Sequence, residues 1–177
     1  IRVAYGEKLP ITQDQVQLNG WSMECRINAE DPFRGFLPST GRLVKFQPPK
    51  EATDAGGTTR VDTGVYDGGE ISMFYDSMIA KLIVHAKDRD SAIERMRDAL
   101  NGFVIRGISS NIPFQAALMQ HKRFQSGNFN TGFIAEEYPK GFDASMVPHD
   151  NPALLVSVAA YVYRSFTDRS ASVSGQL

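Results

Sequence analysis

The stretch from Met23 to Glu30 alternates strictly between apolar and polar side chains, and it restricts the fold more than any other feature of the chain. One set is apolar or small and the other is polar: Met23, Cys25, Ile27 and Ala29 against Glu24, Arg26, Asn28 and Glu30. A period of two is typical of a β-strand with one buried and one open face. We therefore expect a strand here, with Cys25 and Ile27 in the core and Arg26 pointing toward an open cleft.

More strand-like runs follow before any helical pattern appears. Gly41–Phe46 predicts a short strand that ends before two prolines. Arg60–Val65 and Glu70–Tyr75 flank an Asp67-Gly68 pair, which favours a β-hairpin. Met78–Lys87 predicts a longer strand, with Leu82 and its alternate neighbours facing the core.

The helical patterns come later in the chain. Ser91 with Glu94 resembles a capping box and predicts a helix start. Asn111 is suited to cap a second helix, and Thr131 a short third one. Strands first and helices afterwards indicate an α+β fold, a mainly antiparallel sheet with helices packed on it.

The C-terminal part of the chain changes character. Residues 141–151 are polar and contain Gly141 and Pro148, which indicates a linker between a domain at 1–140 and the start of another at 152–177. Asn151–Phe166 predicts a helix with its own apolar stripe, which we expect to stay out of the main core. The Ser-rich tail from Thr167 is expected to be disordered.

Composition excludes several classes of function. The chain has 177 residues, with 19 basic and 20 acidic side chains, so no positive excess exists to neutralise a nucleic acid. No apolar run approaches the roughly 20 residues that a membrane span needs. Cys25 is the single cysteine and the three histidines are scattered, so we expect neither a disulfide nor a metal site. Because the chain begins at Ile1 without a signal-like segment, we expect it to be a fragment.

The polar face of the first strand is the one dense constellation of charged groups on a regular element. On spacing alone, a solvated strand face is the favoured interpretation of Glu24, Arg26, Asn28 and Glu30. The alternative is an anion site, because a guanidinium fixed on a rigid strand is always charged and can stabilise a developing oxyanion.

Several ordered blocks of the sequence resemble the biotin carboxylase family. The blocks are Glu24-Cys25-Arg26-Ile27-Asn28-Ala29-Glu30-Asp31-Pro32, Leu37-Pro38-Ser39-Thr40-Gly41, Arg60-Val61-Asp62-Thr63-Gly64, Tyr75-Asp76-Ser77-Met78-Ile79-Ala80-Lys81-Leu82, Ile105-Arg106-Gly107 with Asn111, and Phe124 through Phe133. Any one of them is a weak signal, whereas their shared order and spacing over residues 1–138 are specific.

The resemblance implies an ATP-grasp ligase that uses ATP and Mg²⁺ to activate bicarbonate and then carboxylates biotin. It implies that Arg26 is the catalytic arginine that contacts biotin and stabilises its enolate-like oxygen. It also implies that Arg60 lies near a dimer interface and that Thr131 forms part of the wall beside the adenine. The family's nucleotide-cradling domain, metal carboxylates and general base would lie upstream of this chain, so we expect the fragment alone to bind no cofactor and to be inactive.

The linker and the last helix resemble those of acyl-CoA carboxylase α chains, propionyl-CoA carboxylases above all. That resemblance implies as partners the rest of the biotin carboxylase domain, a biotin carrier domain and a carboxyltransferase β subunit, in an oligomer. It implies bacterial cytoplasm, or the mitochondrial matrix in a eukaryote. The rival hypothesis is a non-catalytic scaffold and dimerisation module of the same enzyme.

Overall fold

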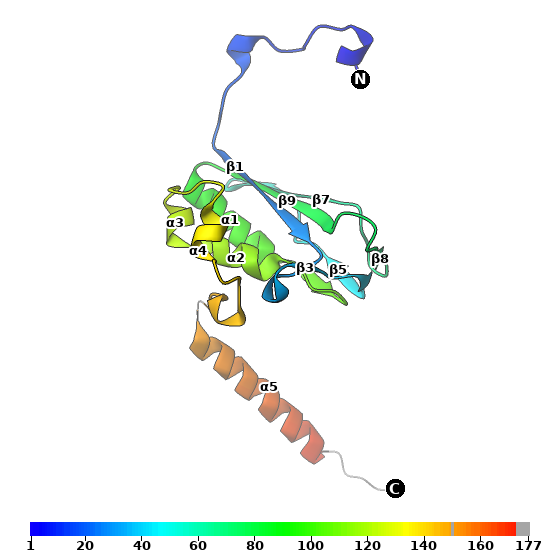
Figure 1. Cartoon of the computed structure of the whole chain (residues 1–177), viewed down its shortest axis with the longest axis vertical. Coiled ribbons are helices and arrows are strands. Elements are labelled where there is room, and N and C mark those ends of the chain that lie inside the picture. The colour runs from blue at the N-terminus through cyan, green and yellow to red at the C-terminus, as the bar shows by residue number, and fades with distance from the viewer. Residues whose placement is uncertain (150, 173–177) are drawn as a thin grey trace.

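The centre of the molecule is a four-stranded antiparallel sheet with the order β1-β9-β7-β6. The structure is a computed structural model that describes residues 1–149 and 151–172. The strands span Trp21–Asn28 (β1), Met78–Ala86 (β9), Gly57–Thr63 (β7) and Ala52–Asp54 (β6). Together with helices packed beside the sheet (Figure 1), this is the α+β fold that the order of the sequence patterns predicts.

Helix α1 (Arg89–Asn101) covers one face of the sheet through Ile93, Met96 and Leu100, all of which are buried. Its predicted start is wrong by one turn. The cap is Asp88, whose side chain accepts a hydrogen bond from the Ser91 amide at 2.8 Å. Aspartate is as effective a cap as serine, and it lies where β9 ends, so the helix begins as soon as the chain leaves the sheet.

Three shorter helices follow, at Ile112–Gln120 (α2), Lys122–Gln125 (α3) and Phe133–Glu137 (α4). The predicted cap at Thr131 is wrong, because the residue before α4 is Gly132, whose amide donates to the Asn130 side chain at 2.8 Å. Short 3-10 turns occur at Val3–Tyr5, Gln13–Gln15, Pro32–Arg34 and Ala144–Met146.

Six short strands form three small ladders beside the main sheet. They are Glu30–Asp31 (β2) with Leu37–Pro38 (β3), Gly41–Arg42 (β4) with Glu70–Ile71 (β8), and Lys45–Gln47 (β5) with Val104–Arg106 (β10). The predicted hairpin is therefore wrong, because β8 pairs with β4 and not with β7. The Asp67-Gly68 turn exists, but it docks on Leu43, whose carbonyl accepts from the Gly68 amide at 2.7 Å.

Helix α5 (Pro152–Ser172) and the N-terminal segment before β1 extend away from this body (Figure 1). Leu155, Val158 and Val162 are 51–59% exposed, so the prediction that this helix stays out of the main core is confirmed. The helix continues to Ser172, so the expectation of disorder from Thr167 is wrong up to that residue, and residues 173–177 lie outside the described part. Within that part, no helix is long and apolar enough to cross a bilayer.

Candidate functional site

Strand β1 directs Arg26 and Cys25 to opposite faces of the sheet. Cys25 and Ile27 are buried against α1, as the alternation predicts, whereas the Arg26 side chain is 69% exposed. The predicted face is correct, but the predicted cleft is not formed around Arg26 by the described residues: the guanidinium faces solvent. Its ion pair with Glu24, at 3.5 Å, is long and exposed, and it contributes little to holding the side chain.

The backbone beneath Arg26 is held much more firmly than its side chain. The Arg26 carbonyl accepts hydrogen bonds from the side-chain amides of Asn111 and Gln115, each at 3.0 Å. Asn111 also accepts from the Asn28 amide at 2.9 Å, where the pairing of β1 with β9 is interrupted by a bulge after Ile27. The strand end is thereby fixed to the start of α2, which sets the point from which Arg26 projects.

A second set of contacts joins the end of β1 to the block before β9. Glu30 accepts from the Ser77 hydroxyl at 2.5 Å and from the Asn28 side-chain amide at 3.2 Å, and the Ala29 amide donates to the Ser77 carbonyl at 2.7 Å. The Asn28 side-chain oxygen is buried and has no hydrogen-bond partner among the described residues. Such an acceptor is costly to leave unpaired, which marks this corner as one that a further group could complete.

The strand register brings Arg26 and Arg60 to the same open face of the sheet. Arg26 lies opposite Lys81 on β9, and Lys81 lies opposite Asp62 on β7. In the next row of the same face, Ile83 on β9 lies opposite Glu24 on β1 and opposite Arg60 on β7. Directly paired residues share a face, so two cations, Arg26 and Lys81, are neighbours, an unfavourable pairing that an anion or a partner would relieve. Arg60 itself pairs with Asp62 at 3.0 Å.

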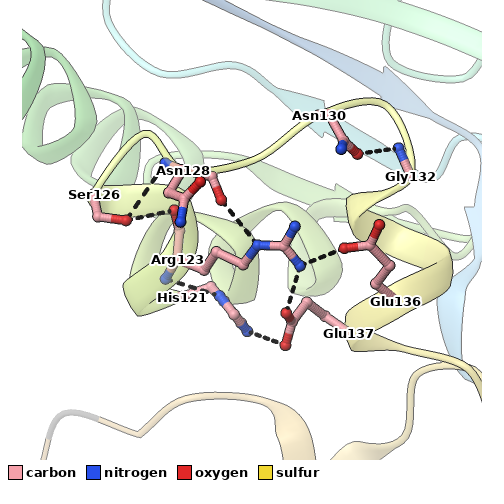
Figure 2. A network of polar contacts seen from close by, with 8 residues as sticks. All are labelled: His121, Arg123, Ser126, Asn128, Asn130, Gly132, Glu136 and Glu137. Carbon is pink, nitrogen blue, oxygen red and sulfur yellow. Dashed lines mark hydrogen bonds and ion pairs between the residues drawn. The ribbon is translucent and has the colours of Figure 1, made fainter.

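Thr131 belongs to another part of the molecule, the connection between α3 and α4. It is exposed, and its neighbours Asn130 and Gly132 form the turn that precedes α4. Figure 2 shows the polar network around this connection, which the sequence did not predict: His121, Arg123, Glu136 and Glu137. Hydrogen bonds from Arg123 hold the pKa of the Glu137 carboxyl below its usual range, and the nearby His121 acts in the same direction.

Cys25 carries the one thiol on the candidate strand, and it is not available for chemistry. Burial, with the Glu24 charge as a smaller cause, raises the pKa of its thiol to about 12. The thiolate is the reactive form of cysteine, and it is absent at neutral pH. The interpretation of Cys25 as an inert core residue is consistent with this.

Comparison with known proteins identifies the family. Residues 24–136 match the model of the biotin carboxylase C-terminal domain. The chain belongs to this family. It is 47% identical over its full length to the propionyl-CoA carboxylase α chain of Ruegeria pomeroyi, of which it covers 28%. It is 48% identical to biotin carboxylase 1 of Bacillus subtilis over 76% of this chain and 29% of that one.

The same likeness extends to solved structures. The biotin carboxylase domain dimer of the Hydrogenobacter thermophilus 2-oxoglutarate carboxylase, in complex with MgADP, ADP and bicarbonate, matches with a TM-score of 0.72. That match is 39% identical and covers 85% of this chain and 31% of that one. The chain therefore spans less than a third of the relatives it matches.

Proposed function

We propose that this chain is the C-terminal part of the biotin carboxylase component of an acyl-CoA carboxylase, propionyl-CoA carboxylase in preference. The complete enzyme would carboxylate biotin at the expense of ATP and bicarbonate, and a partner carboxyltransferase β subunit would carboxylate the acyl-CoA. The observation that carries the proposal is Arg26, a charged side chain projecting from a strand end that Asn111 and Gln115 fix in place, within the family-defining segment.

Arg26 is proposed to be the catalytic, biotin-binding residue. Biotin, when bound, supplies the ureido nitrogen that accepts the carboxyl group, and negative charge develops on the neighbouring ureido oxygen. The Arg26 guanidinium offers planar donors of permanent charge to such an oxygen. A permanently charged donor stabilises an oxygen most when negative charge has developed on it, so the effect of Arg26 should be largest in the transition state.

ATP and Mg²⁺ belong to the same proposal but to residues outside this chain. In this scheme the rest of the biotin carboxylase domain would hold the phosphates and the metal, Thr131 would contribute to the wall beside the adenine, and the fragment alone would be inactive. The biotin would arrive on a carrier domain. The proposed location is the cytoplasm of a bacterium or the mitochondrial matrix of a eukaryote.

The domain limits at 140 and 152 are also part of the proposal. The Ruegeria relative, a propionyl-CoA carboxylase α chain, matches the whole of this chain, whereas the compact Bacillus biotin carboxylase matches 76% of it. This difference supports reading 141–151 as a linker and 152–177 as the start of a domain that tethers the carboxyltransferase subunit. Phe142 is nevertheless buried against Phe114 and Tyr138, so the linker's first residues are anchored to the body.

The second candidate function is a scaffold and dimerisation module without a catalytic role. The open face of the sheet favours this scaffold function. Arg60 and Glu24 flank Ile83 on that face, so a partner surface could contact charged side chains of both signs there. In this case Arg26 would be one more interface charge. Its loss would then change subunit association and leave the chemistry intact.

The test is Arg26→Gln and Arg26→Lys in the complete carboxylase, with ATP cleavage and carboxybiotin formation measured separately. Losing one charged donor to a developing oxyanion should slow carboxybiotin formation about 10²–10³-fold, or roughly 3–4 kcal/mol. Lysine should restore little because it lacks the planar fork. Bicarbonate-dependent ATP cleavage should fall much less.

Arg60→Gln is the matched control, since it removes an arginine from the same face one row away. It should alter the sedimentation behaviour of the enzyme more than its rate. If Arg26→Gln lowers both rates together, the residue supports the fold or the bicarbonate site. If Arg26→Gln changes association alone, the scaffold function is correct.

A further inference from the structure

A single arginine joins the connection between α3 and α4, residues 126–132, to the helix that follows it. Arg123 on α3 donates through Nε to the Asn128 carbonyl at 2.8 Å, so it binds the loop backbone itself. Through Nη1 it contacts Glu136 at 2.6 Å and Glu137 at 2.8 Å, both on α4 (Figure 2). One guanidinium therefore spans the loop and the helix that follows it.

The network around Arg123 is preorganised by further contacts. Glu137 also meets the His121 ring nitrogen at 3.3 Å, and the other ring nitrogen of His121 accepts from the Arg123 amide at 3.2 Å. The Arg123 guanidinium lies 5.5 Å from the centre of the Phe133 ring, within the range of a cation–π contact. The Arg123 side chain is 29% exposed, so these contacts are only partly screened by solvent.

Two carboxylates at the C-terminal end of a short helix are unfavourable without such a partner. Glu136 and Glu137 are the last two residues of α4, and their like charges repel each other at close range. Arg123 compensates both charges, and it contacts both α4 and the backbone of the loop. Thr131 lies between these two points of contact with Arg123, in a turn that the Gly132 amide closes on the Asn130 side chain.

We propose that Arg123 is a positioning residue for the nucleotide. It holds residues 126–132 in place, and with them Thr131, which would contact the nucleotide. The inference rests on the proposed function, in which Thr131 lines the adenine site. Arg123 acts through the loop and does not itself reach the reacting atoms. Its loss leaves a loop that must be ordered at each binding event, which weakens nucleotide binding and spares the chemical step.

The experiment uses the complete carboxylase and measures bicarbonate-dependent ATP cleavage over a range of ATP concentrations. Arg123→Gln should raise the KM for ATP roughly three- to tenfold, the range for newly ordering one side chain, with kcat nearly unchanged. Arg123→Lys, which keeps the charge but not the fork, should lie between Gln and wild type. Glu136→Gln removes half of the carboxylate pairing and serves if Arg123→Gln fails to fold.

Arg95→Gln is the matched control. Arg95 on α1 forms a comparable partly buried pair with Asp54, far from this loop in the chain, and its loss should leave the KM for ATP unchanged. A fall in kcat shared by Arg95→Gln and Arg123→Gln would mean a general loss of stability and overturn the proposal.

Thr131→Trp separates this proposal from the function on which it rests. A raised KM in Thr131→Trp together with an unchanged KM in Arg123→Gln overturns the positioning role and keeps the adenine assignment. An unchanged KM in both variants overturns the positioning role and the adenine assignment together. A raised KM in both, with Arg95→Gln unchanged, supports the proposal.

Discussion

Helices α1 and α5 both carry apolar residues at helical spacing, yet one is buried and the other is open. In α1 the apolar residues form a single stripe, and the stripe meets the inner face of β1 and β9. In α5 the stripe that contains Leu155, Val162 and Phe166 is exposed, and so are Val156 and Tyr163, which lie about 80–100° further round the helix. A helix with exposed apolar residues on more than one side needs a partner that covers more than one side. The apolar stripe of α1 is buried within this chain, whereas α5 is suited to a core that other residues must supply.

The largest expected difference between the two regions is in the stability lost when a large apolar side chain is shortened to alanine. Leu82 on β9 is 0% exposed, so Leu82→Ala removes its contacts and leaves a cavity. We expect the free energy of unfolding to fall by about 2–5 kcal/mol. Leu155→Ala, the matched change on α5, should stay within about 0.5 kcal/mol. Urea unfolding of the chain measures both, and equal costs for the two variants would contradict the division into body and appended helix.

A smaller effect should appear at alkaline pH, through the buried thiol. Folding raises the pKa of Cys25 to about 12. Below the pH range in which an ordinary thiol titrates, both the folded and the unfolded chain keep the proton, so Cys25 does not change the free energy of unfolding there. Above that range the unfolded chain releases the proton first, and stability falls as pH rises. At pH 10 the loss relative to pH 8 should be about 1–2 kcal/mol.

The control for the thiol is Cys25→Ala, which shares every other titrating group with the wild type. Its unfolding free energy should change less between pH 8 and pH 10, and the difference between the two slopes isolates the thiol. Identical slopes would mean that Cys25 is exposed to solvent in the folded state. No such effect is expected on α5, which contains no cysteine.

The sequence predicted those features that depend on neighbouring residues. The two faces of β1, the core face of β9 and the open character of α5 follow from local periodicity. The pairing of β8 with β4 did not, because the Asp67-Gly68 turn docks on Leu43, and that choice is made by packing across the fold. Local turn chemistry cannot report a partner more than twenty residues away.

The candidate site divides in the same way. Arg26 was found because its strand alternates and its motif is specific. Asn111 was predicted as a helix cap and as part of a family-like block, whereas its side chain binds the β1 backbone at Arg26 and Asn28 and makes no cap hydrogen bond. The Arg123 network was missed because Arg123 meets Glu136 only after the chain has turned through residues 126–132. A spacing of that length carries no periodic signal.

The smallest expected effect is that of removing α5 altogether. If the helix is an appendage, a chain that ends at residue 149 should unfold with a free energy within about 0.5 kcal/mol of the full chain. The physical reason is that an isolated helix of this length is marginal in water, so its own folding adds little. Trp21, the single tryptophan, begins β1 in the body and reports unfolding by fluorescence in both chains. A loss above roughly 1 kcal/mol would exceed what a non-contacting surface change produces and would show that α5 packs on the body.

The helical circular dichroism signal of the two chains gives a second measurement. If α5 is helical in the isolated full chain, the signal lost on truncation should correspond to the helical residues removed. A smaller loss of signal, with an unchanged free energy of unfolding, would mean that α5 becomes helical only when a partner surrounds it.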